Sequence, residues 1–202
     1  LSGNVQRRSS TQIGPSGKLK SNKIVLSAVG GKKIPSVDNW IAGYRAGAKA
    51  YDKSAKVLID YSNDFTPATA TKCKEIALKH ISQGAQAVFQ VAGGCGLGAL
   101  NAAGEHQRWG IGVDADQSYL GPHILTSAQK GVDAAVFLTI KAIQDGTWKG
   151  GGNATFGLKE DGVGLGKVSA DVPQADVDKV NEIKQQIADG EITGIPTTVG
   201  KS

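Results

Sequence analysis

The sequence lacks several features that define familiar functional classes. None of its 202 residues falls in an apolar run of 18 or more, so we expect no membrane-spanning helix. The nucleophile elbow G-x-S-x-G, the P-loop and the H-E-x-x-H motif are all absent. The two cysteines and three histidines occur at no metal-ligand spacing. We therefore expect no metal site, and the sequence favours a protein that is not an enzyme.

Charge of one sign is not concentrated anywhere either. The chain carries 23 Lys and Arg against 18 Asp and Glu, which gives a net charge of +5. Its basic residues are scattered and have no interleaved aromatic residues, so we expect no nucleic-acid partner. No signal peptide or lipid-attachment cysteine is recognisable at the amino end. Export, if it occurs, would need a signal outside these residues.

What the sequence does contain is a repeated strand–helix pattern. Short apolar runs alternate with segments whose apolar residues recur at helical spacing. The predicted strands are 23–29, 56–61, 87–92, 110–113 and 123–126. The first predicted helix has Ser36 as its N-cap, and two more run over 70–83 and 99–108. This alternation predicts an α/β fold, a parallel sheet with helices on both faces, over residues 23–126.

The two ends of the chain differ from this pattern. Residues 1–22 lack hydrophobic periodicity and are predicted to be a tail or linker. In residues 127–202 we expect a long helix capped by Ser127, short strands at 154–158 and 162–168, and a last helix over 174–188. These helices have no sheet of their own to cover. We therefore expect 127–202 to pack partly on something that 23–126 does not supply.

Glycine-rich or polar turns follow four successive predicted strands. These turns are Gly30-Gly31, Ser62 to Phe65, Gly93-Gly94, and Asp114 to Gln117. Because parallel strands end at the same edge of a sheet, the four turns should lie together, and ligands bind at that edge in open α/β sheets. The sequence therefore predicts a ligand crevice there.

Three side chains in these turns have two interpretations each. The ring of Phe65 either stacks on a planar ligand or packs into the core. Asp114 and Asp116 either accept hydrogen bonds from ligand hydroxyl groups or cap turns of the backbone. The sequence alone does not choose between these roles.

An enzyme reading competes with simple ligand binding. The pattern Gly94-x-Gly96-x-x-Ala99 follows a predicted strand, and Asp114 comes about 20 residues later, as in dinucleotide-binding folds. Taken alone, this indicates an NAD-dependent oxidoreductase. Against it, the motif lies in the third strand–helix unit instead of the first, and no catalytic pair is evident.

Eight ordered motifs give the chain a more specific resemblance. They are Gly30-Gly31 with Ile34-Pro35, Gly43-Tyr44-x-Ala46-Gly47-Ala48, Lys74-Glu75-Ile76-Ala77, Val91-Ala92-Gly93-Gly94-x-Gly96-x-Gly98, Gly112 to Gln117, Leu125-Thr126-Ser127 with Lys130 and Val132-Asp133, Asp145-Gly146-Thr147-x-Lys149-Gly150-Gly151, and Gly157 to Leu165. Together they cover roughly residues 24–195. The chain resembles the basic membrane protein family of ABC-transporter substrate-binding lipoproteins, which includes purine-nucleoside receptors.

The resemblance implies a fold, an activity and a site. The fold would be that of a type I periplasmic-binding protein, with two lobes closing on a ligand; the family's amino-terminal lobe is not among these residues. The activity would be capture of a small solute, usually a purine nucleoside, for an ABC permease, without a cofactor. The implied ligand-binding residues are Phe65, Ala92, Gly93, Gly94, Asp114, Asp116, Gln117 and Lys130.

Two further expectations depend on that resemblance. The parent protein would be extracytoplasmic, in the periplasm or at the cell surface, and anchored by a lipoprotein signal outside this chain. Pairing of lobes or of chains would be possible. In such a compartment Cys73 and Cys95 would be able to form a disulfide, although two small buried thiols fit the sequence nearly as well.

Overall fold

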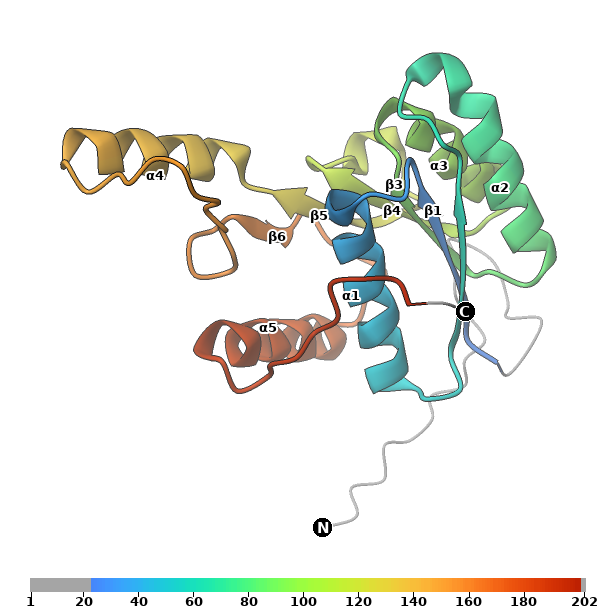
Figure 1. Cartoon of the computed structure of the whole chain (residues 1–202). Coiled ribbons are helices and arrows are strands. Elements are labelled where there is room, and N and C mark those ends of the chain that lie inside the picture. The colour runs from blue at the N-terminus through green and yellow to red at the C-terminus, as the bar shows by residue number, and fades with distance from the viewer. Residues whose placement is uncertain (1–22, 201–202) are drawn as a thin grey trace, which may run out of the picture.

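The fold is built around one six-stranded sheet (Figure 1). The computed structural model describes residues 23–200, so the predicted tail at 1–22 lies outside the described residues. The strands are β1 (Val25–Gly30), β2 (Lys56–Tyr61), β3 (Ala87–Val91), β4 (Trp109–Asp114), β5 (Ile124–Lys130) and β6 (Val163–Leu165). Four of them lie within about two residues of the predicted ranges, and β5 is longer than predicted.

The order of the strands determines where a ligand crevice can form. The sheet order is β2-β1-β3-β4-β5-β6; the first five strands are parallel and β6 is antiparallel to β5. The chain moves outward from β1 to β2 and then returns past β1 to β3. Its direction across the sheet therefore reverses between β1 and β3, and such a reversal opens a crevice at the carboxyl ends of the two strands.

Helices cover both faces of the sheet, as predicted. On one face α1 (Pro35–Tyr51) packs on the cluster that contains Ala28 and Phe89. On the other face α2 (Ala70–Ser82) and α3 (Gly96–Glu105) pack on the cluster that contains Val29 and Val88. Neighbouring strand residues point to opposite faces, so β1 and β3 contribute residues to both clusters. The predicted α/β fold is confirmed.

Two predicted helix caps are wrong. Ser36 was expected to cap the first helix, but α1 begins one residue earlier with Pro35, whose fixed φ and missing N–H suit the first helical position. Ser127 was expected to cap the long helix, but it is buried in the middle of β5. The helix α4 (Val132–Gln144) begins only at Val132. Pairing of β5 with both β4 and β6 keeps residues 127–130 extended.

The carboxyl-terminal region, residues 131–200, is packed far less densely than the sheet. It contains α4, β6 and α5 (Gln174–Asp189), and neither helix has a buried residue. The prediction of a strand within 162–168 is confirmed by β6, whereas the strand predicted at 154–158 does not form. Figure 1 shows α4 extending away from the sheet. Across 23–200, no helix combines the length and apolar character that a membrane crossing requires.

Candidate functional site

The aromatic side chain predicted at the site lies where the chain reverses direction across the sheet. Phe65 is half-buried at the edge of the cluster formed by α1 and the sheet. Its ring lies so close over Gly31, the residue after β1, that a Cβ at Gly31 would overlap it. On the β3 side, a Cβ at Gly93 would lie 3.1 Å from the Phe65 carbonyl oxygen. Phe65 therefore bridges the two strand ends that flank the crevice.

The loop that carries Phe65 is ordered by its own carboxylate. Asp64 Oδ1 accepts hydrogen bonds from the backbone N–H groups of Phe65, at 2.7 Å, and Thr66, at 3.0 Å. The Thr66 bond is the main reason that the pKa of Asp64 lies below its usual value. Because an ionised carboxylate accepts these bonds best, the loop is held most firmly near neutral pH.

Glycines let the next turn pack closely against this loop. A Cβ at Gly94 would lie 2.5 Å from Pro67, which opens the short helix η1 (Pro67–Thr69). Gly96 lies against the Gln90 side chain, and Gly98 lies against the Ala70 carbonyl of α2. Ala92 is fully buried at the start of the turn. Gly96 and Gly98 thus serve packing inside the lobe, which removes much of the support for a dinucleotide-binding role of the Gly94-x-Gly96 turn.

The disulfide considered from the sequence forms in the structure. Cys73 in α2 and Cys95, the last residue of the short helix η2 (Gly93–Cys95), are bonded, and both are fully buried. The described chain has no free cysteine. Disulfides of this kind are typical of proteins that fold in an oxidising compartment.

A second group of predicted residues gathers at the ends of β4 and β5. Asp114 ends β4 in the left-handed region, with φ of 67°. Lys130 ends β5, and its Nζ lies 2.7 Å from Asp114 Oδ1, with about half of each side chain exposed. Lys130 was predicted near the start of a helix, but it belongs to β5. Its partner is the Asp114 carboxylate at the end of the neighbouring strand β4.

The remaining two predicted residues have partners within the protein. Asp116 accepts hydrogen bonds from the backbone N–H and the hydroxyl of Ser118, both at 3.1 Å, which is the turn-capping role considered for it. The Gln117 side-chain oxygen accepts from Gln90 at 2.8 Å and from the Val113 backbone at 3.0 Å. Gln117 therefore links β3 and β4 directly below the sheet edge.

The predicted residues thus form two groups along one edge. Phe65, Gly93 and Gly94 contact one another's loops at β1 and β3, whereas Asp114 and Lys130 meet at β4 and β5. The second group lines a polar groove of about 470 Å³, which Phe65 does not line. Side chains of both signs line this groove, and they are Asp114, Lys130, Asp133, Asp161 and Lys184.

Two contributors to this edge, Lys32 and Gln90, were not predicted from the sequence, and Gly31 was predicted only as part of a turn. Gly31 supplies the surface under Phe65, and Lys32 places its Nζ 6.0 Å from the centre of the same ring. Gln90 is 1% exposed at the end of β3 and holds both Gln117 and the Ala92 backbone N–H. A glutamine inside the apolar run of β3 was a visible signal; the position of Lys32 over Phe65 depends on loop geometry and had none.

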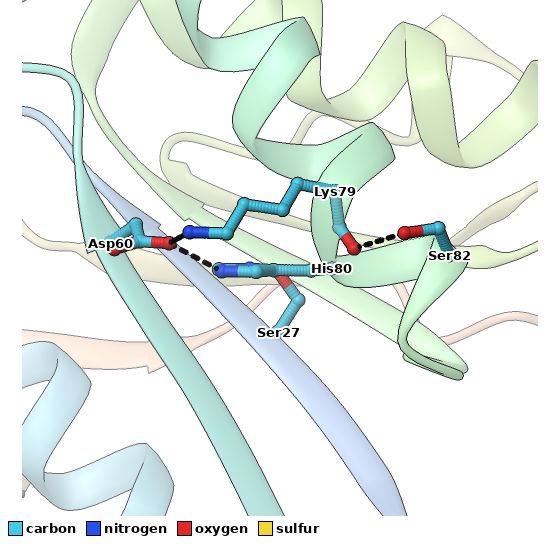
Figure 2. A network of polar contacts seen from close by, with 5 residues as sticks. All are labelled: Ser27, Asp60, Lys79, His80 and Ser82. Atoms are coloured by element: carbon cyan, nitrogen blue, oxygen red, sulfur yellow. Dashed lines mark hydrogen bonds and ion pairs between the residues drawn. The ribbon is translucent and has the colours of Figure 1, made fainter.

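A Ser–His–Asp arrangement, in which the serine and the histidine are buried, lies elsewhere in the lobe (Figure 2). His80 Nδ1 is 2.7 Å from Ser27 Oγ, and His80 Nε2 is 3.0 Å from Asp60 Oδ2, which also pairs with Lys79 at 2.9 Å. Burial lowers the pKa of His80, although hydrogen bonding to Asp60 opposes this shift.

The resemblance to a catalytic triad does not extend to function. A nucleophilic hydroxyl must reach its substrate, and Ser27 is fully buried. The arrangement connects β1, β2 and α2 instead. Within the described part of the chain, no group of three or more His, Cys, Asp or Glu side chains is placed to hold a metal ion.

Solved structures define the class of protein to which this fold belongs. The ABC transporter solute-binding protein from Aeropyrum pernix K1 superposes with a TM-score of 0.72 at 25% identity, over 87% of this chain and 58% of that one. The sheet and its helices are therefore those of a periplasmic-binding-protein-like lobe.

The particular family follows from sequence comparison. Residues 16–196 match the family described as Bmp, ABC transporter substrate-binding protein PnrA-like, and the chain belongs to this family. It is 35% identical over 190 residues to the CD4+ T-cell-stimulating antigen of Listeria monocytogenes. It is also 35% identical over 192 residues to the nucleoside-binding protein BmpA of Lactococcus lactis. Each match covers 86% of this chain and 52% and 53% of those proteins, so the chain spans about half the length of these relatives.

Proposed function

We propose that this chain is the nucleoside-binding lobe of an ABC-importer receptor that captures a purine nucleoside outside the membrane. The observation that carries the proposal is the position of Phe65 over Gly31 and beside Gly93, at the reversal point of the sheet. An aromatic ring that packs against glycines offers a stacking surface for a purine base. The hydrogen-bonding groups of Asp114 and Lys130 lie along the same edge of the sheet. The related BmpA is named for nucleoside binding, which supports this choice of ligand.

The polar group at the neighbouring strand ends suits the sugar. About half of the Asp114 side chain is exposed, and a carboxylate accepts hydrogen bonds from two ribose hydroxyls at once. Lys130 holds Asp114 in place through their ion pair, so that a bound ribose would meet an oriented acceptor. In this proposal Asp116, Gln117 and Ala92 shape the edge and keep Asp114 and Gly93 in position.

The carboxyl-terminal region supports a two-lobe receptor. Five large apolar side chains of α4 are 52–66% exposed: Val132, Val136, Phe137, Ile140 and Ile143. Three of them, Val132, Val136 and Ile140, line an apolar groove of about 430 Å³ that Phe156 also lines. The relatives are about twice as long as this chain, and we propose that a second lobe covers this face and closes on the ligand. A membrane permease and an extracytoplasmic, lipid-anchored location belong to the same proposal.

A thermal-shift screen tests the ligand. Adenosine, guanosine, inosine, cytidine, ribose and NAD are each added to the chain, because a ligand that binds only the folded state raises the melting temperature. The proposal expects stabilisation by the purine nucleosides above all. Stabilisation by NAD alone would contradict it and favour an oxidoreductase.

Variants at two positions then locate the site. Phe65→Leu keeps an apolar side chain but removes the ring, and loss of base stacking worth about 1–3 kcal/mol should weaken binding roughly 5- to 150-fold. Asp114→Asn suits the left-handed backbone at this position while removing the charge, and it should also weaken binding. Phe137→Leu on α4 is the matched control and should bind like the wild type. Equal affinity of Phe65→Leu and Phe137→Leu would contradict the proposed stacking.

A further inference from the structure

Two loops form the aromatic side of the proposed site, and they come from different strand–helix units. One runs from Asp64 through η1 into α2 and carries Phe65. The other is η2, which carries Gly93 and Gly94 and leads into α3. The distance between these loops sets how far the Phe65 ring lies from the glycine backbone.

Few direct interactions hold the two loops together. The Cys95 backbone N–H donates to the Phe65 carbonyl oxygen at 3.3 Å, which is long for an amide hydrogen bond. Gly94 packs against Pro67, and Gly98 packs against Ala70. These contacts, and the buried cluster shared by α2 and α3, favour close packing, but they do not join the two loops covalently.

The Cys73–Cys95 disulfide joins the two loops directly behind the site. Cys73 lies in the first turn of α2, and Cys95 follows Gly94 immediately. The Cα atoms of the two cysteines are 5.7 Å apart, and both side chains are fully buried. The crosslink therefore limits separation of the two loops more strictly than packing alone can.

We propose that the Cys73–Cys95 disulfide is a positioning element of the ligand site, which fixes the Phe65 loop against the Gly93–Gly94 turn and makes ligand affinity depend on the oxidised state. As far as affinity is concerned, this rests on the proposed nucleoside function. The coupling of the two loops does not rest on it. Loss of the crosslink should loosen these loops beyond its effect on the stability of the whole lobe.

The test compares the paired variant Cys73→Ala/Cys95→Ala with the oxidised wild type by amide hydrogen exchange and by titration with adenosine. Exchange at residues 65, 66 and 93–96 should accelerate at least tenfold more than exchange in β1. The adenosine dissociation constant should rise at least tenfold.

Ile81→Ala is the matched control. Ile81 packs against the same core cluster as the disulfide, but near the other end of α2, after which Gly84 turns the chain toward β3. Truncation of Ile81 should lower the melting temperature. It should accelerate amide exchange in the two loops no more than in β1. Adenosine affinity should change less than threefold.

Equal loop exchange in the paired variant and in Ile81→Ala would overturn the inference and leave the disulfide a general stabiliser. Accelerated loop exchange with no nucleoside binding, even in the wild type, would support the positioning role and contradict the proposed function.

A paired variant that fails to fold is replaced by wild type treated with a dithiol. Two electrons and two protons convert the disulfide to two thiols while the dithiol closes to its own cyclic disulfide. Global unfolding on this treatment, without prior loosening of the two loops, would also overturn the inference.

Discussion

The lobe formed by residues 23–130 and the carboxyl-terminal region formed by 131–200 bury their apolar side chains to opposite degrees. Among the described residues, every buried hydrophobic side chain lies between Ala28 and Ile124. The carboxyl-terminal region exposes Phe137, at 66%, and Trp148, at 44%. Apolar clusters that remain exposed are characteristic of surfaces that bind another protein or domain.

The difference separates two kinds of amphipathic helix. The apolar face of α1 lies on the sheet and includes Ile41, which is fully buried. The apolar face of α4 has the same kind of residues at the same spacing, yet Ile140 is 52% exposed. Periodicity alone shows that a helix has a face to bury; only the sheet topology shows that α1 has a surface to cover and α4 does not.

A matched pair of substitutions gives the largest expected effect. Ile41→Ala should lower the free energy of unfolding by about 2–5 kcal/mol, because it leaves a cavity in the core. Ile140→Ala should change it by less than about 0.5 kcal/mol, as for most exposed positions. Urea denaturation measures both. If Ile140→Ala destabilises a chain of the relatives' full length more than it destabilises the present chain, a second lobe covers α4. If Ile41→Ala and Ile140→Ala destabilise the present chain equally, the two regions do not differ in packing as described.

The disulfide should stabilise the lobe alone. Its cysteines are separated by 22 residues, and removing such a loop closure costs about 3 kcal/mol of stability. Cys73→Ala/Cys95→Ala should therefore shift the urea midpoint of the lobe strongly. Hydrogen exchange in α4 and α5 should not change, and protection lost equally in both regions would show that the two unfold as one unit.

Substitution of glycine should have opposite signs in the two regions. Gly94→Ala forces a Cβ against Pro67 and should cost about 1–3 kcal/mol by overpacking. Gly164→Ala in β6 meets nothing within 4 Å and should stabilise by roughly 0.5–1 kcal/mol, since alanine loses less backbone entropy. Thermal denaturation of both variants checks the prediction, and destabilisation by Gly164→Ala would indicate tighter packing in the carboxyl-terminal region than its exposure suggests.

Acid should act on the lobe, which contains all three histidines of the chain. Burial keeps the pKa of folded His80 below its unfolded value of about 6.5, so the unfolded state binds the proton first. The stability contributed by neutral His80 is complete above that pH and declines as the pH falls through it.

His80→Gln should flatten this decline, measured as the free energy of unfolding between pH 7.5 and 5. His123, whose pKa burial also lowers, should account for a remaining slope that His123→Gln removes. Partial burial raises the pKa of Asp60, but hydrogen bonds and charge interactions with Lys79 and His80 together lower it by more. Stability should therefore decline further below about pH 4, where the Asp60 carboxylate becomes protonated. An unchanged slope in both histidine variants would contradict the assignment.

Much of the fold was predictable because its signals are local. The apolar run of β3 and the glycines that follow it define a strand and a turn without reference to the rest of the chain. Ser127 was misassigned because its extended conformation depends on β4 and β6, which are distant in sequence. A polar residue shortly before a helical pattern looks like a cap unless those partners are known.

The candidate site was predictable to a smaller extent. That Phe65, Gly93 and Asp114 share an edge follows from parallel strands. The ion pair between Asp114 and Lys130 and the cover of Gly31 by Phe65 depend on register and loop geometry, which no local pattern encodes. Whether Phe65 stacks on a ligand stays a prediction, since its ring is half-buried and contacts the core as well.

The position of β1 between β2 and β3 also has a consequence for how the chain folds. Among the described residues β1 is the earliest strand in the sequence, yet its neighbours in the sheet are β2 and the much later β3. Pairings between distant segments form slowly, because a long loop must close before any contact rewards it. Until β3 has emerged, one edge of β1 has no strand to pair with. A nascent chain is therefore most prone to aggregate during this interval, and substitutions that delay β3 should reduce the yield of soluble protein before they affect the finished fold.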